Sequence, residues 1–331
     1  MNFAYVLVSD SSDIYYEQFL VSLISLKHWN PDANVLVVID DVTEKNLVDL
    51  RSRHLKYVDE IKVVNFASDK DKHYRSRYLK TTLRKVFTGD FLYLDSDTIV
   101  CDKIDETEFI NDVMGVDDCH QLLHDNSNRL IFLDQIRQSG FSEAGLIHYI
   151  NGGVLWMRDN DIARHFSTLW HELWLQSIMR QISVDMPSLN EANKRMNGVV
   201  GVLSGEYNCQ ISVNLRYLHY AKIIHCFATK VSNINDDKNA YYFLNPDFYR
   251  EIKSREISVA DEEKIINAKS AFDDGETILL GKRNSNIYIN LSRTSLYGFI
   301  YCLFNSKRGR WLFDLMDKIV GFVTRLFWPK K

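Results

Sequence analysis

The sequence predicts an α/β fold with a mixed, mostly parallel sheet and helices on both faces. Three observations lead to this prediction. Short apolar segments alternate with longer amphipathic segments over the N-terminal part of the chain. The apolar segments lack polar alternation, which is typical of strands buried on both faces. Polar clusters at 9–13 and 95–97 directly follow two of these segments, and ligands of such sheets bind at the carboxyl ends of the strands.

The predicted elements alternate between strand and helix from the first residues onward. Strands are expected at 3–8, 35–40, 61–66 and 91–100, and helices at 15–29, 43–55 and 74–87. Asn30 and Pro31 end the first helix, and Thr43 is expected to cap the second. The alternation weakens after residue 100, where further strands are expected at 114–118 and 150–157 and an amphipathic helix at 162–179.

Composition places the chain among ordinary soluble proteins, because 46% of its 331 residues are hydrophobic and 25% are charged. A net charge of −4 gives no electrostatic reason to expect a nucleic-acid partner. The five cysteines are scattered without a CxxC spacing, so we expect a reducing, cytoplasmic location. We expect no signal peptide and no membrane-spanning helix, since no apolar run reaches about 20 residues.

Asp95 and Asp97 in FLYLDSDTIV are the most informative feature of the sequence. Carboxylates at the end of a buried strand are costly unless something neutralises them. Three interpretations fit: a turn after a strand, a phosphoryl-transfer site of the haloacid-dehalogenase type, or a divalent metal that holds a diphosphate. The phosphoryl-transfer motif normally follows the first strand and ends in Gly-Thr. Here the pair follows the fourth predicted strand and the glycine is absent.

Further motifs follow one another along about residues 3 to 230. They are the strand-end segment 8–15, YLDSDTIV around Asp95, GVDD at 115–118, YINGGVLWM at 149–157, DMPSLN at 185–190, LSGEYN at 203–208 and HCFATK at 225–230. In this order they resemble the family 8 retaining glycosyltransferases, which include glycogenin and bacterial lipopolysaccharide galactosyl- and glucosyltransferases. The resemblance implies a single GT-A type domain.

The resemblance also implies a metal site and a donor. Asp95, Asp97 and His225 would bind Mn²⁺ (or Mg²⁺), and the donor substrate would be a UDP-sugar. Two carboxylates with an imidazole nitrogen favour manganese over magnesium. The acceptor would be a glycan or a lipid-linked saccharide of lipopolysaccharide or capsule biosynthesis.

The remaining site residues implied by the resemblance divide by the part of the donor that they contact. The residues expected around the base and ribose are Val8, Ser9, Asp10 and Tyr15, with Ser96 and Gly152 also assigned to the donor. The expected diphosphate partners are Arg77, Lys80 and Lys230. The residues expected to hold the transferred sugar are Asp118, Asn151 and Asp185. Retention without an enzymic nucleophile implies front-side attack, in which the leaving diphosphate accepts the proton of the acceptor.

Two departures from the family pattern keep other functions open. Lys230 stands five residues after His225 instead of six, with Ala228 in place of the family's glycine. Met186 replaces the usual glutamine, and its thioether cannot donate a hydrogen bond. A non-catalytic sugar-nucleotide-binding protein, or an inverting enzyme with Asp185 as its base, are therefore alternatives.

The C-terminal end of the chain differs from the rest in charge. Residues 307–331 contain seven Lys or Arg and two Asp, a net of +5, which leaves −9 for the other residues. Apolar residues recur here at helical spacing. We expect a catalytic domain over 1–230, an irregular or helical extension over 231–306 and a basic amphipathic tail. The tail predicts a peripheral helix on an anionic membrane surface, with a core or dimer helix as the alternative.

Overall fold

The structure is a computed structural model that describes residues 1–227, 241–272, 287, 290–291, 294–304 and 307–327. The chain divides into two compact units, Met1–Thr277 and Ile278–Lys331. The first unit contains the sheets and every described residue of the predicted site. The predicted boundary at residue 230 remains a prediction.

The first unit is built on a seven-stranded sheet with the strand order β3-β2-β1-β4-β7-β6-β8. Its strands are β1 (Asn2–Leu7), β2 (Asn34–Asp40), β3 (Glu60–Val64), β4 (Phe91–Leu94), β6 (Val113–Asp117), β7 (Ile150–Met157) and β8 (Val200–Val202). Neighbouring strands are parallel except at β7, which is antiparallel to both β4 and β6. The predicted mixed, mostly parallel sheet is confirmed.

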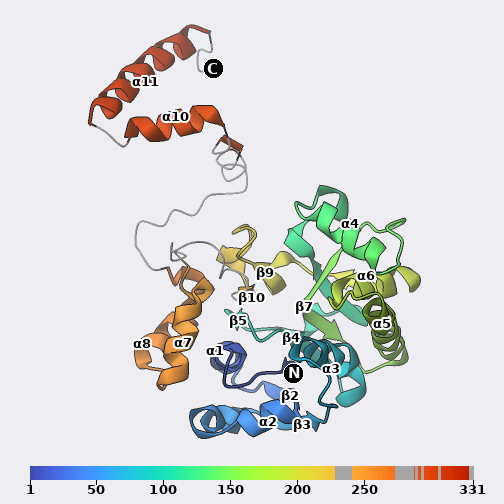
Figure 1. Cartoon of the computed structure of the whole chain (residues 1–331). Helices are drawn as coiled ribbons and strands as arrows, with labels where there is room; N and C mark the ends of the chain where they lie inside the picture. The colour runs from blue at the N-terminus through green and yellow to red at the C-terminus, as the bar shows by residue number, and fades with distance from the viewer. Residues whose placement is uncertain (228–240, 273–286, 288–289, 292–293, 305–306, 328–331) are drawn as a thin grey trace. The chain divides into compact units, whose positions relative to one another are not determined.

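The helices cover both faces of this sheet (Figure 1). On β1, Phe3 and Tyr5 face one hydrophobic core with α1 (Tyr15–Trp29), while Ala4 and Val6 face another. The second core is closed by α3 (Lys72–Val86), α5 (Asp161–Met179) and α6 (Met186–Arg195). Successive strand residues point to opposite faces, so strands covered on both sides must be apolar throughout. This explains the uninterrupted apolar segments of the sequence.

The predicted strand at 91–100 is divided in two. β4 ends at Leu94, and β5 (Thr98–Val100) belongs to a separate three-stranded sheet with β10 (Ile223–His225) and β9 (Cys209–Gln210). β5 pairs antiparallel with β10, and Thr98 lies opposite His225. The break at residues 95–97 thus carries the chain from the large sheet to the small one.

The predicted helix at 43–55 is also divided, into α2 (Asp41–Asn46) and the 3-10 segment η1 (Asp49–Tyr57). Its cap is Asp40, whose Oδ1 accepts a hydrogen bond of 2.7 Å from the backbone N–H of Thr43. Thr43 was therefore assigned wrongly as the cap. Aspartate is equally favoured at this position, and here it is also the last residue of β2.

The described part of the predicted extension contains α7 (Pro246–Ser254) and α8 (Val259–Ile266). Both pack on the α1 side of the sheet, where Phe248 and Ile265 join the first hydrophobic core. In the C-terminal unit, α10 (Ser295–Phe304) and α11 (Lys307–Phe327) pack against each other (Figure 1). No helix among the described residues combines the length and the apolar character needed to span a bilayer.

Candidate functional site

The two aspartates lie in the turn between β4 and β5, at the carboxyl end of a central strand. The backbone N–H of Asp95 donates to the carbonyl of Gly153 on β7 at 2.8 Å, which anchors the turn to the large sheet. The hydroxyl of Thr98 donates to the carbonyl of Asp95 at 2.8 Å. One oxygen of each carboxylate lies within 4.8 Å of the other, as the metal interpretation requires.

His225 reaches this turn from the end of β10. Its Nε2 lies 3.1 Å from Oδ1 of Asp97 and 3.9 Å from Oδ2 of Asp95. One ligand atom from each of the three residues lies within 4.8 Å of the others, and no other such group of His, Cys, Asp or Glu occurs in the described ranges. Two carboxylates and one imidazole are suitable ligands for a divalent ion such as Mn²⁺.

The surroundings of Asp97 favour its ionised form. Burial raises the pKa of Asp97, but the neighbouring His225 outweighs it and holds that pKa below its usual value. Burial raises the pKa of Tyr93 well above its usual value, so its hydroxyl stays protonated and donates to Oδ1 of Asp95. Lys80 adds an ion pair to the same carboxylate at 3.0 Å.

A cavity of about 310 Å³ opens beside the aspartates. Of the residues predicted to bind the donor or the metal, Val8, Tyr15, Arg77, Asp95, Ser96 and Asp97 line it. The sequence interpretation missed six others, namely Val6, Gln18, Lys72, His73, Ser76 and Tyr93. His73 precedes Arg77 by four residues and Lys72 precedes Ser76 by four, and this helical spacing was a usable signal.

Asp185 stands at the start of α6 and forms ion pairs with the two predicted cations of α3. Arg77 Nε lies 3.0 Å from its Oδ1, and Lys80 Nζ lies 3.6 Å from its Oδ2. Burial raises the pKa of Asp185, but Lys80 and Arg77 outweigh it, so the net shift is downward. Lys80 is buried between Asp95 and Asp185, whereas Arg77 lines the cavity. Of the two, only Arg77 is placed to contact a ligand there.

Asp118 and Asn151 lie together at the carboxyl side of β6 and the beginning of β7. Asn151 Nδ2 donates to Oδ2 of Asp118 at 2.8 Å. A side chain at Gly152 would meet Asp185 and Lys80 at 3.5 Å, an ordinary contact distance. At Gly153 a Cβ would lie 2.1 Å from Cε1 of His225. The second glycine of the NGG sequence, which the sequence interpretation did not single out, is therefore the one that the histidine ring requires.

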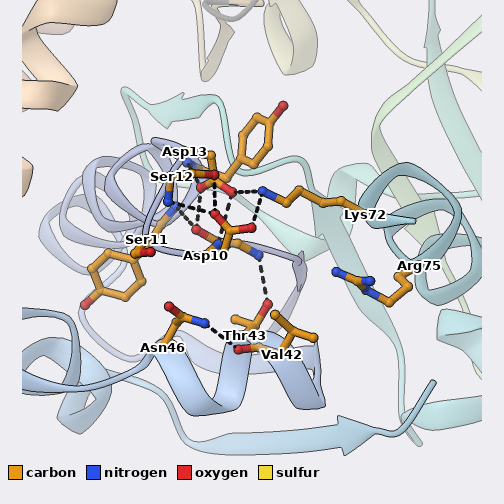
Figure 2. Close-up of polar contacts among 12 residues, drawn as sticks. Asp10, Ser11, Ser12, Asp13, Val42, Thr43, Asn46, Lys72 and Arg75 are labelled. Carbon is orange, nitrogen blue, oxygen red and sulfur yellow. Dashed lines mark hydrogen bonds and ion pairs between the residues drawn. The ribbon is translucent and has the colours of Figure 1, made fainter. Parts of the chain in front are cut away.

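The loop after β1 forms the other end of the site. Figure 2 shows Lys72 extending from α3 to Asp10 and Asp13, with Nζ distances of 2.7 and 2.5 Å. Ser9 is buried, and its N–H donates to the hydroxyl of Thr43 at 2.8 Å. The side chain of Lys72 holds the pKa of Asp10 far below its usual value. The loop is thus fixed largely by charges.

Two further cations hold this loop from the opposite side. Arg51 donates to the carbonyl of Asp10 at 2.8 Å and forms an ion pair of 2.9 Å with the buried Glu17. Lys253, on α7, donates to the carbonyls of Ser11 and Asp13 at 2.5 and 2.6 Å. The helices after residue 240 therefore contribute directly to the shape of the predicted base-binding loop, which no local motif in the sequence indicated.

The two departures noted in the sequence have different outcomes. Met186 is half-buried and packs against the apolar cluster of Leu123, Phe132, Leu133, Ile136 and Tyr149. Its side chain thus belongs to a hydrophobic cluster. Lys230 and Ala228 lie outside the described residues.

No protein-family model and no curated protein matches the sequence. Among solved structures, the galactosyltransferase LgtC in complex with donor and acceptor sugar analogs is similar with a TM-score of 0.51 and 15% identity, covering 80% of this chain and 100% of that one. An active-site mutant of LgtC gives a TM-score of 0.48, 14% identity and coverages of 83% and 97%. The glycosyltransferase GlyE of Streptococcus pneumoniae TIGR4 gives 0.42, 14%, 84% and 65%.

At 15% identity, the similarity to LgtC in complex with sugar analogs concerns the fold alone. The seven-stranded mixed sheet, the helices on both faces and the full coverage of the LgtC chain agree with the architecture described above. The protein therefore has a GT-A type α/β fold, like that of the glycosyltransferase LgtC.

Proposed function

We propose that this protein is a retaining glycosyltransferase that moves a hexose from a UDP-sugar to a saccharide or glycolipid acceptor. The observation that carries the proposal is the convergence of Asp95, Asp97 and His225 beside the cavity of about 310 Å³. The two aspartates lie in a turn and His225 on a strand, and more than a third of the chain separates them. The GT-A type fold, shared with LgtC, is consistent with this activity.

Asp95, Asp97 and His225 would hold the metal, for which Mn²⁺ suits the donor set better than Mg²⁺. The bound ion would supply Lewis-acid stabilisation of the leaving diphosphate. Arg77 lines the cavity and would contact the diphosphate directly. Lys80 would mainly balance the charge of Asp95 and Asp185, because it is buried between them. Lys230 remains a predicted phosphate ligand.

Val8, Ser9, Asp10 and Tyr15 would form the base and ribose site, with Ser96 at its inner end. Tyr15 offers an aromatic ring in the wall of the cavity. Lys72, beside Asp10, is added to this set because it lines the same cavity and bridges two carboxylates of the loop. Its ammonium could exchange one of these partners for an acceptor atom of the nucleotide.

Asp118, Asn151 and Asp185 would hold the transferred sugar, next to Gly152. The lowered pKa of Asp185 and its two cationic partners make it a weak general base. This favours the retaining reaction over the inverting alternative. In the retaining reaction the leaving diphosphate would take the proton of the acceptor, and the protein would supply position and charge.

The decisive experiment is a screen of UDP-sugars for UDP release with Mn²⁺, with Mg²⁺ and without metal. We expect Mn²⁺-dependent release with at least one donor and about a 100-fold loss in Asp97→Asn. Asp102→Asn is the matched control, since Asp102 is an exposed aspartate just after β5. Retained activity in Asp97→Asn would contradict the metal assignment.

Two further measurements separate the alternatives. The NMR spectrum of the first product gives its anomeric configuration, and inversion would contradict the retaining mechanism. Titration calorimetry measures UDP binding without any acceptor. Binding without product for any donor and acceptor would support the non-catalytic sugar-nucleotide-binding protein instead.

We propose that α11 attaches the enzyme peripherally to an anionic membrane, on the inner face of which a lipid-linked acceptor would be available. Exposed apolar side chains recur along this helix, namely Trp311, Leu312, Leu315, Ile319, Val320 and Val323. Arg308, Arg310 and Lys318 are exposed on the same helix. Apolar and basic side chains together favour the surface of an anionic bilayer.

Vesicle co-sedimentation tests this attachment. The full chain should bind vesicles that contain anionic lipid more strongly than vesicles of neutral lipid. A chain cut after residue 306 should lose this difference. Equal binding of the two chains to anionic vesicles would contradict the proposal.

A further inference from the structure

A row of buried side chains connects the proposed sugar site with the proposed metal site. Asn151 Nδ2 donates to Asp118 Oδ2 at 2.8 Å, and Asn208 Nδ2 donates to Asn151 Oδ1 at 3.0 Å. Asn208 Oδ1 lies 3.0 Å from Nδ1 of His225. Asn208 comes from the end of the segment η5 (Gly205–Asn208) and is fully buried. Asn208 does not line the cavity beside the aspartates.

The direction of every hydrogen bond in this row follows from one backbone group. The N–H of Gly153 donates to the side chain of Asn151 at 2.9 Å. A backbone N–H can only donate, so the atom that it faces must be the amide oxygen of Asn151. The same oxygen faces Asn208, which must therefore present its NH₂ group there. The oxygen of Asn208 then faces His225, and only a protonated Nδ1 can donate to it.

The other end of the row agrees with this assignment. With its oxygen toward Gly153, Asn151 must turn its NH₂ group toward Asp118, whose carboxylate is an acceptor. Both amides are thus oriented by partners of fixed polarity, a backbone donor and a carboxylate.

The tautomer of His225 decides which atom faces the aspartates. When Nδ1 carries the proton of the neutral ring, Nε2 carries a lone pair. Nε2 lies 3.1 Å from Oδ1 of Asp97, so in this tautomer a cation could accept the lone pairs of both atoms. The ring packs against Gly153 of β7, where it occupies the space that a Cβ would need, 2.1 Å from Cε1. Such a cluster of acceptors is complementary to a cation.

We propose that Asn208 is a positioning residue that fixes the Nδ1-protonated tautomer of His225 and thereby directs Nε2 to the metal. The inference rests on the metal site of the proposed function. Hydrogen bonds from a ligand's second nitrogen typically change metal affinity by about 10- to 100-fold when they are lost. Asn151 and Asp118 have a dual role, since they orient Asn208 and also lie in the proposed sugar site.

The first test measures Mn²⁺ binding to the full chain by electron paramagnetic resonance, without any nucleotide or sugar. Asn208→Ala should weaken Mn²⁺ affinity by about 10- to 100-fold. Asn208→Asp should recover only part of this affinity, because its carboxylate still accepts from Nδ1 but has no donor for Oδ1 of Asn151. Asn193→Ala is the matched control: Asn193 is also buried, and its oxygen accepts from the N–H of Val200 in another part of the fold.

Two outcomes of this titration have different meanings. Absence of Mn²⁺ binding in the unaltered protein would overturn the metal site of the proposed function. Normal binding in the unaltered protein together with unchanged affinity in Asn208→Ala would overturn the role of Asn208 alone.

The second test observes the tautomer directly and does not depend on activity. Proton–nitrogen correlation spectra of ¹⁵N-histidine-labelled, metal-free protein would be recorded over a range of alkaline pH. The signals of His225 are identified by their loss in His225→Gln. We expect a protonated Nδ1 in the unaltered protein and a mixture of tautomers in Asn208→Ala. A ring that is protonated at Nε2 and not at Nδ1 in the unaltered protein would overturn the inference.

Discussion

The two ends of the site are built by different means. At the proposed metal end, Asp97 and His225 are held by strand ends and by neutral amides, and His225 is buried against the backbone of Gly153. At the proposed nucleotide end, the loop of Asp10 and Asp13 is held by ion pairs to a partly exposed Lys72. Buried, hydrogen-bonded groups keep one geometry, whereas partly exposed ion pairs exchange partners at low cost. The metal end is therefore preorganised and the nucleotide end is adjustable.

The largest expected effect concerns a buried ion pair beside the loop, that of Arg51 and Glu17. Arg51→Met leaves the Glu17 carboxylate buried without its cation, which should cost about 3–5 kcal/mol of unfolding free energy. Urea denaturation measures this loss. The double variant Glu17→Gln, Arg51→Met should recover part of it, because no unpaired charge remains. Equal stability of the single and double variants would show that charge burial is not the cause.

The next effect tests how rigid the metal end is. Gly153→Ala places a Cβ against the ring of His225, and Mn²⁺ affinity should fall about 100-fold. Gly152→Ala is the matched control, because its nearest contacts are at 3.5 Å. It should leave Mn²⁺ affinity within a few-fold and mainly raise the KM for the sugar donor. Similar Mn²⁺ affinities in the two variants would mean that the ring can move.

A pH experiment addresses α3, which carries Lys72 at one end of the site and Arg77 and Lys80 at the other. Burial of His171 beneath this helix lowers its pKa to about 4. The unfolded chain then binds the proton more readily, so stability is complete above about pH 6.5 and declines as the pH falls toward 4. At pH 5 the loss should be about 2 kcal/mol.

His171→Gln should lack this part of the acid sensitivity. The measurement is the difference in unfolding free energy between the two proteins at pH 7 and pH 5. An identical decline in both proteins would contradict the assignment.

The smallest effect concerns the adjustable end alone. Lys72→Met removes the two ion pairs of the loop, and UDP affinity should fall about 5-fold, in line with about 1 kcal/mol for partly exposed pairs. Mn²⁺ affinity should not change. Lys70→Met is the control, since Lys70 pairs with the exposed Asp69 instead. A loss of Mn²⁺ affinity in Lys72→Met would show that the two ends are not independent.

Elements with strong local signals were predicted well from the sequence. The helix Tyr15–Trp29 and the strand Ile150–Met157 have the predicted bounds. Residues 43–55 were predicted as one helix, but the helix ends at Asn46. Its local pattern was helical, while the cap was set by Asp40 at the end of β2.

The break of residues 91–100 into two strands has a physical cause outside the segment. The apolar run continues after Asp97, so local periodicity gives one strand. Thr98–Val100 instead pairs with β10, and its partner strand lies more than a hundred residues further along the chain. Pairing between distant segments is not encoded in local periodicity.

The sequence by itself determined the fold class, the two aspartates at a strand end and, through the order of its motifs, the pairing of these aspartates with His225. Only the tertiary structure decided which groups surround them. The His225 ring lies so close to residue 153 that only glycine fits there. The side chain of residue 208 must donate to Asn151 and accept from His225, which lie on two other strands. Arg51 and Lys253 reach the same loop from segments about 200 residues apart. Such contacts depend on which distant segments meet in the folded protein. Residue type and local spacing do not show which segments these are.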